Sequence, residues 1–289
     1  MTGFKFYHYD PSFAAAVVFA LVFCVATIRH MQLMSKNKTW YFLPFIIGCL
    51  FETGGYIARA ISARQTPDWT LMPYIIQSLL TLLGPTFFAA SIYMILGRLI
   101  RYLEADAYSM IRPKWLTKFF LLGDILSFFA QGGGGGLLAS AKSESSQSMG
   151  NKIILLGLGI QVIFFGLFII VTVVFHIRIT KGPSPKSLTT PTPWKRFIYV
   201  LYFTSLLIMV RSVFRMAEYA QGNDGSLLQN EAYAYVLDAL LMLIVTACFA
   251  LFHPSKVLRK EISFPSENES LQESGNDYLM SRGNGFARI

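Results

Sequence analysis

The sequence predicts an all-α, polytopic membrane protein with seven transmembrane helices. Of its 289 residues, 54% are hydrophobic and only 14% are Asp, Glu, Lys or Arg, whereas soluble domains contain about 25% of these charged residues. About 20 helical residues, rising 1.5 Å each, cross a hydrocarbon core about 30 Å thick. Seven such helices would occupy about half of the chain, which excludes a large extramembrane domain.

Seven apolar segments account for this prediction. None of them alternates apolar and charged faces with the period of 3.6 residues that is typical of a surface helix in a soluble protein. The segments run approximately from Pro11 to Met34, Tyr41 to Ser62, Met72 to Gly97, Lys114 to Ala139, Gly150 to His176, Arg196 to Tyr219 and Glu231 to His253. Residues 1–10 are then a short extracellular N-terminus, 11–253 the transmembrane domain and 254–289 a disordered cytoplasmic tail rich in Ser and Glu.

Three segments carry residues that disturb a regular helix or connection. Pro85 predicts a kink in the third helix. In the fourth, five glycines (132–136) directly follow Gln131, and each costs about 1 kcal/mol relative to Ala, so they should weaken or break the helix. The alternative explanation is close packing through small residues. Four prolines favour an extended connection between the fifth and sixth helices: Pro183, Pro185, Pro191 and Pro193.

The basic residues predict the orientation. If loops alternate between sides, 18 of the 25 Lys and Arg fall on the side that carries the C-terminus. The positive-inside rule places this side in the cytoplasm and the N-terminus outside. Because the basic residues are dispersed between apolar segments, the net charge of +9 is a topology signal, and we expect no nucleic-acid partner.

Ionisable residues inside the spans are the candidates for a functional site, since a charge at the bilayer centre costs about 2.5 to 3.5 kcal/mol on insertion scales. Counting at 1.5 Å per residue places Glu52 and Asp124 near the midplane and the other charged candidates in the outer third. This placement indicates either a polar cavity open to the outside or a purely structural ion network. The candidate substrate-binding or translocation-path residues are Glu52, Tyr56, Arg59, Asp124, Gln131, Arg211, Arg215, Glu218 and Asp238.

Other function classes have weaker support. No Walker-type motif is present, so transport would be downhill or coupled to a gradient. His30, His176 and His253 lie at predicted cytoplasmic helix ends and would suit a zinc hydrolase by residue type, but Asp124 would lie roughly 15 Å deeper. We therefore expect no enzymatic activity, no metal and no cofactor. A seven-helix lipid sensor without transport remains an alternative, although the rhodopsin-like receptor motifs are missing.

Several motifs together resemble the fungal lipid-translocating exporter family, also called RTA-like or resistance-to-aminocholesterol proteins. The most specific piece is Arg211-Ser212-Val213-Phe214-Arg215-x-x-Glu218, with Gly222 and Gly225 following. The others are Tyr7-x-Tyr9-x-Pro11-Ser12, Phe51-Glu52, Gly55-Tyr56-x-x-Arg59, Gln77, Pro85, Ala89-Ala90-Ser91-Ile92-Tyr93, Gly97-Arg98, Gly123-Asp124, Gln131-Gly132, Glu231, Asp238 and His253-Pro254.

This resemblance implies an integral protein of the plasma membrane, or alternatively of the vacuole or another endomembrane, whose partners are membrane lipids or amphiphilic small molecules. Sphingoid bases, sterol-like amines and porphyrins are the substrate classes attached to the family. The leading hypothesis is an exporter in which Glu52, Asp124 and Asp238 receive an amine head group. Arg59, Arg211 and Arg215 would organise these carboxylates. A lipid sensor and a lipid hydrolase with a histidine-bound metal are the second and third hypotheses.

Overall fold

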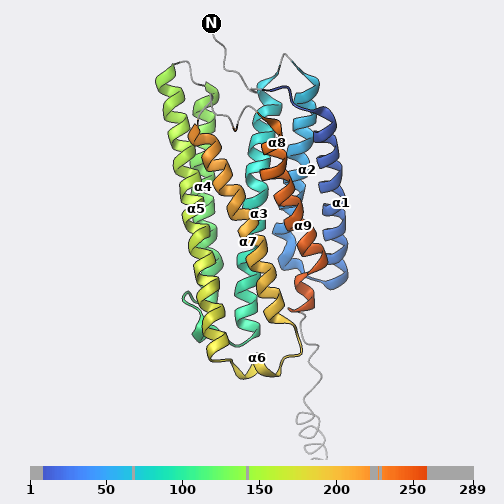
Figure 1. The fold of residues 1–289 in the computed structure, drawn as a ribbon, viewed down its shortest axis with the longest axis vertical. Coiled ribbons are helices and arrows are strands. Elements are labelled where there is room, and N and C mark those ends of the chain that lie inside the picture. The colour runs from blue at the N-terminus through green and yellow to red at the C-terminus, as the bar shows by residue number, and fades with distance from the viewer. Residues whose placement is uncertain (1–8, 67–68, 141–142, 222–226, 228–229, 259–289) are drawn as a thin grey trace, which may run out of the picture. The chain divides into compact units, whose positions relative to one another are not determined.

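A computed structural model describes residues 9–66, 69–140, 143–221, 227 and 230–258. Within these residues the chain forms helices and their connections, without any strand (Figure 1). The long helices are α1 (Phe13–Asn37), α2 (Leu43–Arg64), α3 (Leu71–Tyr102), α4 (Pro113–Ser140), α5 (Glu144–Lys181) and α7 (Trp194–Gln221). The last segment comprises α8 (Glu231–Ala234), a π-helical turn (Tyr235–Ala239) and α9 (Leu240–Leu251).

In the described part of the chain, six helical stretches are long and apolar enough to cross a membrane. They are Phe13–Asn37, Trp40–Arg64, Met72–Tyr102, Ser145–Lys181, Trp194–Gln221 and Glu231–Lys256. The helix expected at Lys114 to Ala139 is present as α4, but it is not among the six. Asp124, Gln131 and the glycine run lower its hydropathy. A multi-span, all-helical protein is thus confirmed, while the seventh span and the outside N-terminus remain predictions.

The helices pack around α3. Consecutive helices are antiparallel, with α4 and α5 along one side of the bundle and α1 on the opposite side (Figure 1). α3 contacts α2, α4, α5 and α7, and α1 packs against α9. In the most apolar window of α3, 61% of residues are buried, against 22% in α1. α3 is therefore the central helix and α1 presents most of its side chains to the lipid.

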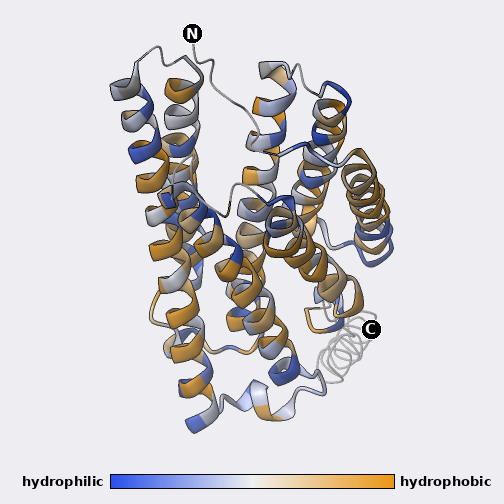
Figure 2. Cartoon of the chain, turned by 45° about the horizontal axis from the view of Figure 1, so that its top comes forward, coloured by the Kyte–Doolittle hydropathy of each residue, from blue (hydrophilic) through white to orange (hydrophobic). Residues whose placement is uncertain are grey.

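The surface is apolar where a membrane would surround it. Hydrophobic residues dominate the middle of the helices, and hydrophilic residues gather at their ends and connections (Figure 2). On α1, Val18, Leu21 and Val25 are more than half exposed. These positions are three and four residues apart and so form one continuous apolar face of the helix, and exposed apolar surface of this extent indicates contact with acyl chains.

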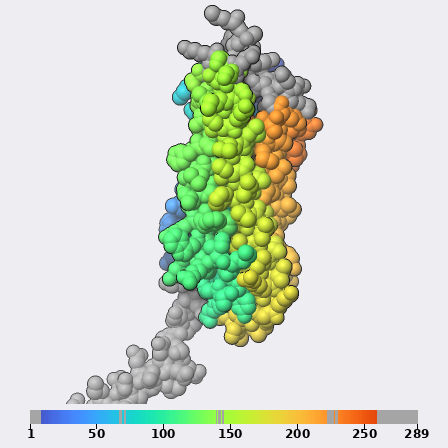
Figure 3. Space-filling model, turned by 90° about the vertical axis from the view of Figure 1, so that its left-hand side faces the viewer, coloured from blue at the N-terminus to red at the C-terminus, as the bar shows by residue number. Residues whose placement is uncertain are grey.

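The glycine run does not break α4, which corrects the expectation from sequence. α4 continues as an α-helix to Ser140 and lies beside α5 along the molecule (Figure 3). A Cβ atom at Gly134 would lie 2.8 Å from the carbonyl oxygen of Gly150 in α5, whereas one at Gly133 would meet nothing within 4 Å. The close approach of two backbones at Gly134 explains why a small residue is needed there.

Replacing Gly134 with Leu should destabilise the protein because the added side chain would collide with the backbone of α5. Overpacking of this kind costs typically 1–3 kcal/mol, and we expect a lower midpoint of thermal unfolding for the purified protein in detergent. Gly133→Leu is the matched control, because that position is exposed and open. Equal unfolding temperatures for the two variants would contradict the assigned α4–α5 contact.

Two segments outside the long helices contain short helical turns: the connection after α5 and the first residues after α9. The proline-rich segment after α5 contains a short helix, α6 (Pro185–Thr189), rather than an entirely extended connection, because Ser184 caps it and Pro185 occupies its first turn. The predicted tail lies mainly outside the described residues. Its first residues form a 3₁₀ turn, Pro254–Lys256, and Val257 is buried in the core.

Candidate functional site

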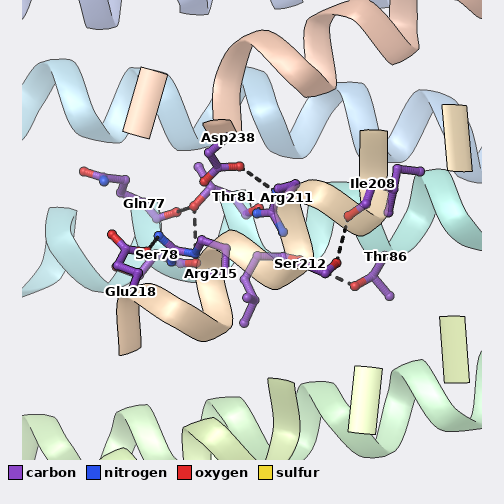
Figure 4. A network of polar contacts seen from close by, with 11 residues as sticks. Gln77, Ser78, Thr81, Thr86, Ile208, Arg211, Ser212, Arg215, Glu218 and Asp238 are labelled. Carbon is purple, nitrogen blue, oxygen red and sulfur yellow. Dashed lines mark hydrogen bonds and ion pairs between the residues drawn. The ribbon is translucent and has the colours of Figure 1, made fainter. Parts of the chain in front are cut away.

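A buried ion pair connects α7 with the π-helical turn. Arg211 Nε donates to Asp238 Oδ1 at 2.6 Å, and the Arg211 side chain is only 1% exposed (Figure 4). Asp238 belongs to the π-helical turn Tyr235–Ala239, and π-helical turns inside α-helices are frequent at functional sites. We call Arg211 and Asp238 the central ion pair.

Pro85 gives Arg211 a second partner. Proline has no amide hydrogen, so it cannot donate to the carbonyl four residues earlier in α3, which is that of Thr81. Arg211 Nη2 donates to this carbonyl oxygen at 2.5 Å. α3 continues as a helix through Pro85, and the carbonyl that the proline leaves without its helical donor is satisfied by the central ion pair.

Glu52, on the middle of α2, is completely buried. Among the described residues, neither of its carboxyl oxygens has a hydrogen-bond partner. Its Oε1 occupies space left by Gly84 of α3, since a Cβ at that position would lie 2.5 Å from it. The charges that act on it most strongly are those of Asp238, Arg211 and Arg215. Glu52 is thus beside the central ion pair but not part of it.

A second ion pair lies nearer the end of α7. Arg215 Nη1 donates to Glu218 Oε2 at 2.7 Å, three residues apart on the same helix (Figure 4). Both side chains are largely buried. Because this pair lies within one helix, it neutralises two charges without linking α7 to another helix.

The third ion pair connects three segments through Arg59. Its Nη2 donates to Glu231 Oε1 at 2.8 Å and to the hydroxyl of Tyr9, while its Nε donates to the hydroxyl of Tyr235. Glu231 in turn accepts hydrogen bonds from the backbone amide of Ser12. This network fastens the start of α1 to α2 and α8. Glu231 was not among the candidate site residues, because a charge at the first position of a span does not stand out as intramembrane.

Tyr56 lies on α2 between Glu52 and Arg59. It is buried, and its ring is stacked on Phe23 with centroids 5.6 Å apart, next to Phe19 and Tyr235. Charges from both the central ion pair and Arg59 act on Tyr56, so this residue lies between the central ion pair and the Arg59 network.

Asp124 and Gln131 form a different polar region, on α4. The hydroxyl of Tyr93 lies beside the carboxyl group of Asp124. Gln131 Nε2 donates to Ser127 Oγ, which itself donates to the carbonyl oxygen of Gly157 in α5. In the described residues neither side chain is hydrogen-bonded to the central ion pair. They serve the contacts of α4 with α3 and α5.

The arginines therefore pair with different acids from those expected from the sequence. Of the three arginines that were to organise Glu52, Asp124 and Asp238, only Arg211 binds one of these acids. Arg215 and Arg59 bind Glu218 and Glu231 instead. Glu52 is left close to both members of the central ion pair without a partner of its own.

An open groove of about 300 Å³ lies elsewhere, between α1 and α2. It is almost entirely apolar and none of the nine candidate residues lines it. Its lining residues are Phe13, Val17, Ala20, Leu21, Ile57, Ala60, Ile61 and Arg64. The polar cavity expected around the charged residues remains a prediction.

The three histidines of the hydrolase hypothesis have other partners. His30 Nε2 is hydrogen-bonded to the carbonyl of Thr246, His253 to Ser255, and His176 to the hydroxyl of Tyr202. Within the described residues, no group of three or more His, Cys, Asp or Glu side chains could hold a metal ion.

Fold and site together define a multi-span helical membrane protein with ion pairs buried inside its bundle. The family described as "RTA1 like protein" matches residues 45–261, so the chain belongs to this family, as the resemblance predicted. It is 36% identical to "Protoporphyrin uptake protein 1" of Saccharomyces cerevisiae, with 86% of this chain and 92% of that protein covered.

Two further relatives come from the same species. "Protein RTA1" is 32% identical, with 96% of this chain and 93% of the relative covered. "Sphingoid long-chain base transporter RSB1" is 28% identical, with 79% and 67% covered. No solved structure matches the chain.

Proposed function

We propose that this chain moves amphiphilic lipids, in particular cationic ones such as sphingoid long-chain bases and sterol-like amines, across the plasma membrane and so confers resistance to them. The names of relatives support lipid-related transport: one is a sphingoid long-chain base transporter and another, 32% identical, a probable lipid transporter of Emericella nidulans. No enzymatic step is part of this proposal.

The main support for a cationic substrate is the buried carboxyl group of Glu52, which has no hydrogen-bond partner among the described residues. The other acids of the central region, Asp238 and Glu218, already bind arginines. An ammonium group offers several N–H donors and a positive charge, which would satisfy both oxygens of Glu52 at once. Because Coulomb attraction is several-fold stronger at low dielectric than in water, a single carboxylate at this depth can select a cation.

The membrane placement of the site is part of the proposal. We take α4 as the seventh span, since a helix of 28 residues packed along α5 is long enough to cross. With the N-terminus outside, the central ion pair and the Arg59 network lie in the outer half. The residues of α2 that line the apolar groove lie about 80° to 180° around the helix from Glu52, so the groove is on a different face of α2, where it offers a surface to the alkyl tail. Binding at the buried Glu52 requires the helices around it to separate.

Reconstitution of the purified full chain into liposomes tests this function. A fluorescent long-chain base is added to one leaflet, and its appearance in the other leaflet is followed. We expect transfer to exceed that in protein-free liposomes and to increase with the protein-to-lipid ratio. A labelled diacylglycerol, which has no charged head group, is the control lipid. Saturable binding without transfer would instead establish the sensor, and cleavage of the lipid the hydrolase.

A further inference from the structure

We infer that Glu52 exchanges one proton for one cationic amphiphile, which makes the chain an electroneutral proton antiporter. This inference rests on the proposed function and adds the source of energy to it. It follows from the surroundings of Glu52, from the single carboxyl group that the two cations would share, and from the lack of a nucleotide-binding motif in the sequence.

The surroundings of Glu52 leave it without a neutralising cation. From α7, Arg211 and Arg215 face it, but Arg211 is held by Asp238 and the Thr81 carbonyl, and Arg215 by Glu218. The π-helical turn contributes the negative Asp238, and α3 contributes the backbone at Gly84.

The remaining neighbours do not change this balance. On its own helix, Cys49 and Tyr56 are the nearby titratable groups, and α1 contributes the apolar ring of Phe23, stacked on Tyr56. A carboxylate in such a place is strongly disfavoured, so the closed site without substrate holds a proton on Glu52.

Proton and substrate exclude each other at this group. An ammonium ion binds the carboxylate and not the neutral acid, so the proton must leave before the substrate binds. The O–H bond of the carboxyl group breaks, its electron pair stays on the oxygen, and water takes the proton. On the other side of the membrane the ammonium ion leaves, and a proton from water forms the O–H bond again.

The same electrostatics make the exchange obligatory. With a proton, or with a bound monovalent cation, the site is neutral and the helices can close around it. With neither, they would have to bury a bare carboxylate beside Asp238. The site therefore switches between the two sides of the membrane only when it holds a proton or a substrate cation. Each cycle moves one proton in one direction and one cation in the other, without net charge.

The test uses the full chain in liposomes and a probe that cannot itself carry a proton: a pyrene-labelled long-chain trimethylammonium ion, which pairs with the carboxylate through its positive charge alone. A pH-sensitive dye is trapped inside the liposomes. We expect addition of the probe to change the internal pH in the direction of counter-moving protons. An imposed pH gradient should concentrate the probe by about tenfold per pH unit, as one-for-one exchange requires. A membrane potential set with potassium and valinomycin should have no effect.

Three variants assign the exchange to Glu52. Glu52→Gln should lose both probe movement and proton movement, while Glu52→Asp should keep slower exchange that is still driven by the pH gradient. Glu104→Gln, an exposed position in the turn after α3, should behave like the wild type.

The outcomes separate the two proposals. Probe movement that follows the membrane potential, at constant internal pH, would overturn the antiport while the proposed function stands. Proton-coupled exchange in Glu52→Gln would overturn the role of Glu52. If neither the probe nor the labelled long-chain base moves under any gradient, the proposed function and the antiport are both wrong.

Discussion

Glu52→Gln is expected to reduce resistance to an added sphingoid base to the level of cells that lack the protein. The substitution preserves the size of the side chain and removes the charge that would attract an ammonium ion. It leaves no unpaired charge behind, so the fold should persist. Growth of a sensitive host strain over a series of base concentrations measures the resistance, and surface labelling measures the amount of protein in the membrane.

Glu104→Gln is the matched control for this experiment. It makes the same chemical change at an exposed site in the turn after α3, and we expect full resistance. If Glu52→Gln also gave full resistance at equal surface level, Glu52 would have no role in receiving the head group.

Asp238→Asn is expected to cause the largest loss of stability. It leaves Arg211, which is 1% exposed, without its counter-charge, and removal of one partner from a buried ion pair costs about 3–5 kcal/mol. Thermal unfolding of the purified protein in detergent should show a lower midpoint, and less protein should reach the membrane. Asp106→Asn, at an exposed position in the turn Asp106–Tyr108, should change neither quantity.

A double variant distinguishes structural from transport roles of the central ion pair. Arg211→Gln combined with Asp238→Asn removes both charges, and the amide nitrogen of Gln takes the place of Arg211 Nε, the atom that faces position 238. We expect the double variant to be more stable than Asp238→Asn alone, because no charge is then buried unpaired. If Asp238→Asn unfolds like the wild type and loses only transport, Asp238 is itself a substrate-binding acid.

Most of the fold could be predicted from the sequence because apolar length and composition determine membrane spans. The helices lie close to the expected segments, and the family resemblance was confirmed. The pairing of charges could not be predicted in the same way. Glu52 and Asp238 look equivalent in the sequence, as acids inside spans. Only the packing of α2, α3 and α7 decides that Arg211 reaches Asp238 and the Thr81 carbonyl while Glu52 stays without a partner.

The glycine run shows a second limit of sequence reasoning. Helix propensities measured in water predict a break at residues 132–136. In the bundle, packing against the neighbouring helix outweighs helix propensity. Gly134 allows the backbone of α5 to approach, and α4 continues through the glycines as an α-helix. A helical backbone also satisfies its own polar groups, which any irregular segment exposed to lipid would fail to do.

The π-helical turn at Tyr235–Ala239 fixes the rotational phase between the two halves of the last span. One helix there supplies acids to two arginines on different helices, Glu231 to Arg59 of α2 and Asp238 to Arg211 of α7. Deleting one residue from the turn would rotate the residues before it by about 100° relative to those after it. The two acids could not then both reach their arginines, so the length of this segment is as constrained as its charges.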